Sequence, residues 1–428
     1  MTMTADMPGQ VPWWKEPTRD QWVAWIAAWL GWTLDAFDFT IFLLIMVPIA
    51  ETFHVPLIEV TAVFTITLWL RLVGAVGSGW LADRVGRKTP LMISILWYSV
   101  CNLLAGIAPS FALLFLFRAL LGIGMGAEWP AGAALAMESW PARSRGLMSG
   151  LLQGSWSLGF LASSAAYGLL YDVIGWRGLL ILGVLPALAV VWIRIYVKEP
   201  KVWLENRRMQ REQHQEFRAP LFEIFRPRIL GNTVMACLWM AASFVIYYSV
   251  YGMFATHLQK DLHLTPAMVA MPLAMANLVA FLASGFWGHV ADILGRRWAM
   301  IIPGAIGALV TPFYLLSDSY PLVAGAFIVQ GAFLGAIYGQ NPAYLTERFP
   351  TEVRATASAF CYHQGAIWAG FTGPLLTYFA ASQPQGFTIP MLITTTGAAV
   401  AFVVTLLFSP ETRGKELVPQ LTLVEQPA

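Results

Sequence analysis

The sequence GWLADRVGRK at residues 79–88 occurs a second time, in altered form, as GHVADILGRR at residues 288–297. Glycine, alanine, aspartate, glycine and arginine recur at matching places in the two copies, which lie 209 residues apart. A second pair of stretches, ESWPARSRG at 138–146 and ERFPTEVRA at 347–355, has the same separation. Two different motifs repeated at one offset indicate that the chain consists of two related halves arranged in the same order.

The composition is that of a membrane protein. Hydrophobic residues make up 57% of the 428 residues and charged residues only 12%, whereas a soluble chain carries about 25% charged residues. The net charge of +2 gives no reason to expect nucleic acid as a partner, and the lipid bilayer is the expected environment. Three cysteines, far apart in apolar segments, indicate neither a disulfide framework nor a metal site.

Twelve windows of the chain reach the length of about 20 mostly apolar residues that a helix needs to span a bilayer. They are 22–49, 58–81, 90–108, 110–135, 146–171, 177–196, 230–257, 267–290, 298–317, 321–345, 355–380 and 388–408. A polar and charged stretch, 197–229, divides them six and six. We therefore predict an all-α membrane protein with twelve transmembrane helices, in two six-helix halves related by a parallel internal repeat.

The same pattern predicts the domain organisation and the orientation. Basic residues gather in 197–229 and in the two repeated loops, and under the positive-inside rule these segments face the cytoplasm. An even number of crossings places both termini there as well. We expect a multi-pass protein of the cell inner membrane, working as a monomer. Its expected parts are a tail over 1–21, a bundle over 22–196, a linker over 197–229, a second bundle over 230–408 and a tail over 409–428.

The loop G-x-L-A-D-R-x-G-R-K between the second and third windows, with its altered copy between the eighth and ninth, resembles the signature loop of the major facilitator superfamily. The resemblance covers nearly the whole chain and implies a twelve-helix transporter that works by rocking-type alternating access. Within that superfamily, DAFDF at 35–39, R-x-x-x-G-x-G-x-G-x-E at 118–128 and ESWPARSRG are similar to the sialate and monocarboxylate proton-symporter branch.

Two neighbouring branches differ from this chain at specific positions. The aromatic-acid symporters usually carry glycine between the two acids of the first helix, where this chain has Ala36. The lactate permeases carry a polar cluster in the seventh helix, where this chain has the aromatic stretch IYYSVYGMFATHL at 246–258. The second departure argues against lactate as the substrate.

The resemblance and the residue chemistry together predict a conformational latch at the repeated loops. Glycine permits the tight turns of a short loop. An aspartate at a helix end, such as Asp83, can accept charge-assisted hydrogen bonds from Arg87 and from a facing helix N-terminus. The alternative is that the loops only set the topology. The expected latch residues are Gly79, Asp83, Arg84, Gly86, Arg87, Lys88, Glu138, Arg145, Asp292, Arg296, Glu347 and Arg354.

Charged residues deep inside the apolar windows all belong to the first half. Asp35 and Asp38 are three residues apart, which places them on one face of a helix. An ionised aspartate in hydrocarbon costs roughly 2.5–3.5 kcal/mol, so these acids must face water or a cation. Acids in a cavity can load and release a proton, and we expect Asp35, Asp38 and Glu128 to carry the coupled proton. The alternative is that they are permanently ionised partners of arginines.

Two deep arginines accompany these acids. A guanidinium matches a carboxylate with two parallel hydrogen bonds, so we expect Arg71 and Arg118 to bind a substrate carboxylate; a structural ion pair with the acids is the alternative. Arg71 ranks first, because it lies about 12 Å along its helix from Gly79. The second half offers uncharged groups instead. We expect Gln340, Asn341, Tyr362, His363 and Gln364 to recognise hydroxyls and apolar edges of a substrate.

These features predict a proton-coupled symporter that imports a small organic acid by alternating access. Its expected partners are a small organic anion and protons. The sequence contains no phosphate-binding G-x-x-x-x-G-K-[ST] loop and no catalytic constellation, so neither an enzyme nor a cofactor is expected. Three alternatives stay open: an aromatic-acid symporter, a neutral sugar facilitator, and an exporter of drugs or metabolites.

Overall fold

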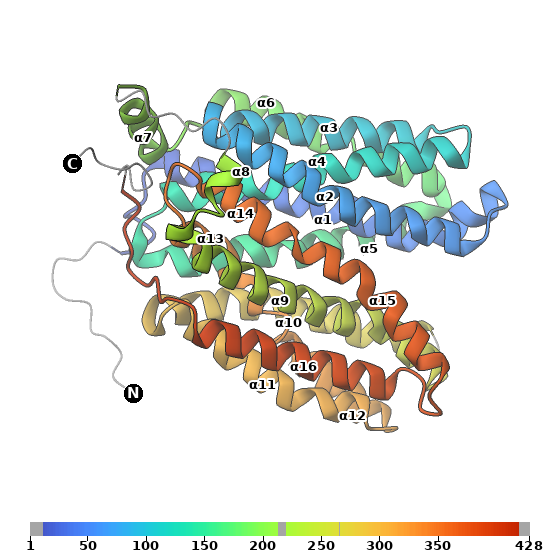
Figure 1. Cartoon of the computed structure of the whole chain (residues 1–428). Coiled ribbons are helices and arrows are strands. Elements are labelled where there is room, and N and C mark those ends of the chain that lie inside the picture. The colour runs from blue at the N-terminus through green and yellow to red at the C-terminus, as the bar shows by residue number, and fades with distance from the viewer. Residues whose placement is uncertain (1–11, 213–219, 265, 419–428) are drawn as a thin grey trace.

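The protein is described by a computed structural model over residues 12–212, 220–264 and 266–418. The predicted linker and both predicted tails therefore lie partly outside the described residues. Helices dominate the described part of the chain, which contains no β-strand. Figure 1 shows the long helices lying side by side, with α1–α6 in the upper group and α9–α16 in the lower one.

The first group follows the first four predicted windows, but its fifth long helix runs through the window 146–171 into the window 177–196. Its helices are α1 (Arg19–Phe53), α2 (Leu57–Val85), α3 (Lys88–Gly106), α4 (Phe111–Ser139), the short 3₁₀ turn η1 (Ala142–Ser144), α5 (Arg145–Leu182) and α6 (Pro186–Tyr196). A capping box between Thr18 and Gln21 begins α1, and the Ser110 hydroxyl caps α4. The chain turns within α5 at Gly175, whose φ of 62° suits glycine.

The second group repeats the first with the same spacing. It follows the linker helices α7 (Lys201–Glu212) and α8 (Pro220–Glu223). Its helices are α9 (Pro227–Lys260), α10 (Pro266–Leu294), α11 (Trp298–Leu315), α12 (Tyr320–Gly331), the 3₁₀ turn η2 (Ile337–Gln340), α13 (Asn341–Arg348), α14 (Arg354–His363), α15 (Gly365–Ala381) and α16 (Thr388–Leu407). The bounds of α2 and α10 differ by 209 residues, the offset of the repeated motifs.

Two predicted spans of the second group are broken. The window 321–345 contains α12, η2 and α13, and the window 355–380 contains α14 and α15, which meet at Gln364. Their counterparts in the first group, α4 and the corresponding part of α5, run without a break. Within the described residues, eight helices are long and apolar enough to cross a membrane, and a bent segment of α5 raises this to nine. These spans make the chain a membrane protein.

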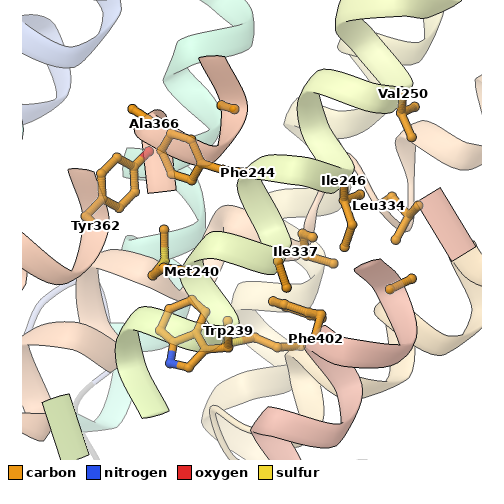
Figure 2. Packing of buried hydrophobic residues seen from close by; sticks show 14 of the residues in the cluster. Trp239, Met240, Phe244, Ile246, Val250, Leu334, Ile337, Tyr362, Ala366 and Phe402 are labelled. Carbon is orange, nitrogen blue, oxygen red and sulfur yellow. The ribbon is translucent and has the colours of Figure 1, made fainter. Parts of the chain in front are cut away.

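Hydrophobic cores form within each group of helices. The largest cluster comes almost entirely from the second group, and Figure 2 shows part of it, with Trp239, Met240 and Phe244 of α9 packed near Phe402 and Tyr362. Another cluster is built from α1 to α5 and the loop before α4. Trp32 and Trp129 of the first group join the largest cluster, which places these two side chains at the boundary between the groups.

One end of the molecule collects the repeated loops, and we call it the loop end. Lys198, after α6, binds Asp20 at the start of α1 at 2.8 Å. The Thr351 hydroxyl, in the turn before α14, donates to the Val418 carbonyl at 3.4 Å. The described chain therefore begins and ends at the loop end, which lies on the left in Figure 1.

Candidate functional site

A cavity with about 770 Å³ of unfilled space, part of it open to solvent, lies between the two groups of helices. The first group contributes a tryptophan pair, an amide and one cationic side chain to its wall, whereas the second contributes mainly tyrosines. The lining includes Trp32, Leu68, Arg71, Gln153, Trp156 and Ser157 on one side and Phe244, Tyr247, Tyr248, Tyr251, Asn277, Tyr338, Tyr362 and His363 on the other. Arg71 is the one arginine or lysine of this lining among the described residues.

Arg71 forms a buried ion pair at the cavity wall. Its Nη2 donates to Asp35 Oδ2 at 2.8 Å, and the aspartate is completely buried. The guanidinium lies 5.4–6.0 Å from the ring centres of Trp32, Phe39 and Trp156, which favours a cation there. Asp35 Oδ1 and Arg71 Nε have no hydrogen-bond partner in the described part of the chain. The arginine therefore keeps donor capacity for a ligand.

Glu128 of α4 lies in a small pocket next to this pair. Neither of its carboxylate oxygens has a hydrogen-bond partner among the described residues. Trp32, Trp129 and Leu152 contribute to the pocket, and Gly31 makes room for the carboxylate, because a Cβ atom at Gly31 would overlap Glu128 Oε1. Gly31 lies one helical turn before Asp35 on the same face of α1. An unpaired carboxylate is costly to bury in the ionised form.

Arg118 and Asp38 lie away from the cavity, among α1, α3 and α4. Arg118 Nη1 donates to Asn102 Oδ1 at 3.0 Å, and its guanidinium stacks 4.2 Å from the ring of Phe42. Asp38 faces the turn at Gly183, where a Cβ atom would meet both Asp38 Oδ1 and Asn102 Nδ2. Asp35 and Asp38 were expected to share one environment, but Asp35 turns to α2 whereas Asp38 turns to α3 and the α5–α6 turn.

The uncharged residues predicted for recognition divide into two sets. Tyr362 and His363 line the cavity; Tyr362 stacks on Trp129 at 3.9 Å between ring centres and accepts a hydrogen bond from Gln153. His363 Nδ1 also lies 3.2 Å from its own helix, at the Ala359 carbonyl.

The other three predicted residues lie outside the lining of the cavity. The Gln364 amide donates to the carbonyls of Cys237 and Cys361 at the break between α14 and α15. The Gln340 and Asn341 side chains are 1% exposed, and their amides have no hydrogen-bond partner within the described residues.

At the loop end, a first charge cluster joins the two groups of helices. Asp83 accepts backbone hydrogen bonds from residues 355–356 at the start of α14, at 3.1 and 2.9 Å. Arg87 binds the same carboxylate at 3.1 Å and Glu138 at 2.7 and 3.0 Å. Arg354 of the second group also donates to Glu138, at 3.0 Å. An aspartate of α2 thus caps the N-terminus of a helix in the other group.

A second charge cluster repeats this arrangement with the groups exchanged. Asp292 accepts backbone hydrogen bonds from residues 146–147 at the start of α5, at 2.8 and 2.9 Å. Arg296 binds Asp292 and, at 3.1 and 3.2 Å, Glu347. Arg145 of the first group donates to Glu347 at 3.1 Å. Both clusters cross the boundary, so the loop end is closed in this structure.

Glycines allow the close approach that these clusters need. A Cβ atom at Gly79 would lie 2.7 Å from Thr356 Cα. Gly86 and Gly295 have φ of 114° and 107°, which suit glycine, and begin the turns that carry Arg87 and Arg296.

The comparisons with known proteins agree with this geometry. A family model described as Major Facilitator Superfamily matches residues 28–257 and 236–423. The chain belongs to the Major Facilitator Superfamily. It is therefore a membrane transporter and not an enzyme.

Relatives in the superfamily include two that match nearly all of the chain. The sialic acid transporter NanX of Escherichia coli (strain K12) is 27% identical over 93% of this chain and 94% of its own. The cis,cis-muconate transport protein of Acinetobacter baylyi (strain ATCC 33305 / BD413 / ADP1) is 28% identical over 85% of this chain and 89% of its own. A solved structure of the proton:xylose symporter XylE, bound to 6-bromo-6-deoxy-D-glucose, has a TM-score of 0.72 and 17% identity, covering 93% of this chain and 98% of that one. This likeness shows a shared fold.

Two glutamates that the sequence analysis did not predict for the latch also contact the charge clusters. Glu199, after α6, accepts hydrogen bonds from the backbone N–H groups of Arg87 and Lys88 at 2.7 and 2.9 Å. Burial raises the pKa of Glu199, and those two N–H groups oppose the rise. Glu411, after α16, does the same for the backbone of residues 296–297. The only available signal was a glutamate next to proline just beyond the sixth and the twelfth window.

Two more segments at the loop end cover the clusters. Trp203 of α7 donates to the Asp83 carbonyl, and its ring lies 5.7 Å from the Arg87 guanidinium. Lys415 accepts from Arg145 and donates to the Glu347 carbonyl, so it contacts both groups of helices. Among the residues predicted for the latch, Arg84 lies apart: its exposed guanidinium stacks on Trp80 at 5.4 Å.

Proposed function

We propose that this transporter is a proton-coupled symporter that imports a small organic acid by alternating access. The observation that carries the proposal is the Arg71–Asp35 ion pair at the wall of the central cavity. A guanidinium with free donors is suited to a substrate carboxylate. The named substrates of the relatives, sialic acid and cis,cis-muconate, are themselves carboxylic acids, which supports the same class here.

Coupling follows from competition for Arg71. While Asp35 is ionised, it occupies the guanidinium. A proton on Asp35 weakens that bond and leaves Arg71 available to an incoming carboxylate, so proton and anion bind with positive coupling. Glu128 of α4 packs against Gly31, one helical turn before Asp35, and its carboxylate has no partner among the described residues, so it is suited to exchange that proton with Asp35. Asp38 is the third proton-carrying candidate. Arg118, Gln340, Asn341 and Gln364 are not among the described residues that line the cavity, so their contact with a substrate stays a prediction that depends on another conformation.

The lining favours one kind of organic acid. Tyr247, Tyr248 and Tyr251 line the cavity together with Trp32 and Trp156, and such surfaces hold a flat, unsaturated or aromatic body better than a polyhydroxylated one. An aromatic or conjugated acid is therefore the second candidate substrate, alongside small organic acids in general. A neutral sugar needs no charge partner and would not use the free donors of Arg71 as a carboxylate would.

The proposed topology has twelve crossings, with the two bundles spanning 22–196 and 230–408 and the linker 197–229 between them. The basic residues of the loop end support its assignment to the cytoplasm, with both tails on that side of the inner membrane. The two charge clusters would then act as latches that hold the cytoplasmic side closed and break when the bundles rock. We propose that one chain suffices for transport, because the cavity is built from a single chain.

Uptake into proteoliposomes tests the proposal. A panel of labelled acids, including an aliphatic monocarboxylate, benzoate and cis,cis-muconate, is offered with and without an inward proton gradient. We expect accumulation of at least one acid only with the gradient. Asp35→Asn should abolish gradient-driven accumulation yet keep counterflow exchange, because exchange needs no net proton release. Gradient-independent accumulation, or full proton-driven activity of Asp35→Asn, would contradict the mechanism.

A further inference from the structure

Two cysteines in the second group of helices lie next to each other, although 124 residues separate them in the chain. Cys237 Sγ of α9 is 3.8 Å from Cys361 Sγ of α14. Both thiols are free. Cys361 is completely buried, whereas Cys237 is partly exposed on the same side of α9 as the exposed residues Val234 and Leu238. Because the Cys237 side chain is partly exposed, a small, uncharged oxidant can reach its thiol.

The surroundings of this pair favour thiol chemistry. Arg348 of α13 makes its hydrogen bonds to neutral groups of Asn232 and Tyr344. Cys361 Sγ lies 3.9 Å from the carbonyl of Thr233, the residue after Asn232, so this cation is close to the pair. A cation near a thiol stabilises the thiolate, which is the reactive form. A disulfide has an S–S length of about 2.05 Å, so the two sulfurs need to approach each other by about 1.8 Å to bond.

We infer that Cys237 and Cys361 form a redox-active dithiol that closes to a disulfide and restrains the break between α14 and α15. With hydrogen peroxide as oxidant, the Cys237 thiolate attacks one peroxide oxygen, which gives a sulfenic acid and, after protonation of the leaving hydroxide, water. The Cys361 thiol then attacks the sulfenic sulfur and releases a second water. Two thiols lose two electrons in total, and one peroxide is reduced to two waters.

The position of the pair explains why its oxidation would matter. Cys361 directly precedes Tyr362 and His363 of the cavity wall. The Gln364 amide already bridges the carbonyls of both cysteines at the break between α14 and α15. A disulfide would turn this contact into a covalent tie between α9 and α14, directly beside the cavity.

Thiol counting tests the dithiol without reference to transport. Purified protein in liposomes is treated with hydrogen peroxide, and the remaining thiols are alkylated and counted by intact mass. We expect the wild type to fall from three alkylated cysteines to one, that one being Cys101, and dithiothreitol to restore all three. Cys361→Ser, which keeps the side-chain size, should form no disulfide: it loses at most the Cys237 thiol, which stops at the sulfenic acid and adds the mass of oxygen. Three reactive thiols in the oxidised wild type, or equal losses in Cys361→Ser, would overturn the site.

Proton-driven uptake tests the restraint, and this second readout rests on the proposed function. Oxidised wild type should transport several-fold more slowly than reduced protein, while Cys361→Ser should be insensitive to peroxide. If the disulfide forms and uptake stays unchanged, the dithiol stands and its restraint of the break is refuted. If reduced protein shows no uptake of any acid, the proposed function fails while the thiol count still decides the dithiol.

Discussion

The two halves of this transporter are nearly identical at the loop end and different inside the membrane. At the loop end each element of the first charge cluster has a counterpart at the 209-residue offset, from the capping aspartate to the helix start that it caps. Within the membrane the same offset pairs each deep charge with an uncharged residue. The pairs are Asp35 with Phe244, Asp38 with Tyr247, Arg71 with Ala280, Arg118 with Phe327 and Glu128 with Ile337.

This difference separates two tasks. The two charge clusters, one from each half, together close the loop end. The proposed binding of a proton and an anion would need charges that interact with one another, and the deep charges are concentrated in the first half. The second half supplies aromatic surface and broken helices at the same depth. Gln153 and Tyr362, which are counterparts 209 residues apart, contact each other at 3.3 Å, so the cavity lies at the symmetry boundary.

The largest expected effect comes from the charged side of the cavity. Arg71→Ala should abolish measurable uptake and binding of an organic anion, because the cavity loses its only described cationic side chain. Arg71→Lys should recover only part of it, since lysine lacks the paired donors. Ala280→Ser, at the counterpart position, is the matched control and should leave binding within a few-fold of wild type. If Arg71→Ala and Ala280→Ser lose anion binding to the same extent, the proposed difference between the two halves is wrong.

The next effect concerns the packing between α5 and α10. A Cβ atom at Gly150 would overlap the Ser284 carbonyl, so Gly150→Val should prevent closure of the loop end and stop transport. Gly325 of α12 has open space around its Cβ position, and Gly325→Ala serves as the control. Labelling of a cysteine introduced at Ser284 in a background without native cysteines reports the closure. The idea fails if Gly150→Val transports at the wild-type rate.

The two capping aspartates test whether the charge clusters are equivalent. Asp83→Asn and Asp292→Asn each weaken two backbone hydrogen bonds to a charged acceptor, a change of about 1–3 kcal/mol. Each should shift the population towards an open loop end by about 5- to 150-fold, since 1.4 kcal/mol corresponds to a tenfold change. Distance measurements between spin labels on α2 and α14, and on α5 and α10, would report this shift. An effect in only one variant would show that the clusters do not share the task.

The smallest effects should come from the outer glutamates. Glu199→Gln and Glu411→Gln keep an oxygen acceptor for the N-termini of α3 and α11 but lose the charge. Each should cost about 0.3–1 kcal/mol, in line with a helix-dipole contribution, and slow uptake less than twofold. Thermal unfolding in detergent measures the cost. A loss as large as that of Asp83→Asn would place these glutamates within the closing contacts themselves.

The charge clusters could be predicted from the sequence, because their charged residues recur at the 209-residue offset. Asp83, Arg87, Glu138 and Arg354 were singled out because they recur at a fixed offset, and they do lie in contact. For Arg71 the sequence allows two hypotheses, binding of a substrate carboxylate and an ion pair with an acid of the first helix, and the structure contains the ion pair with Asp35. A polar residue in an apolar window is a strong signal, because its burial is costly without a partner.

Other features could not be predicted from the sequence. The position of a residue in an apolar window indicates its depth in the membrane, but not the direction in which its side chain points around the helix. Arg118 is as deep as a ligand-binding arginine would be, yet it turns to Asn102 and Phe42. The break in 332–340 is invisible in a continuous apolar window, since hydropathy does not distinguish α-helix from turns. The tyrosines of 247–251 were recognised as aromatic, but their place in the cavity wall depends on how α9 is rotated.

The burial of the two charge clusters has a consequence for hydration. When the loop end opens, water reaches Asp83, Arg87 and their counterparts, and each ion that loses a partner gains a solvation shell. For buried ion pairs these two terms nearly cancel. The clusters therefore fix the shape of the closed form while adding little to its net free energy. Two forms of similar free energy can be exchanged by a ligand with only modest preference for one of them. The hydration of the opened interface therefore contributes to the free-energy difference between the two forms of the transporter.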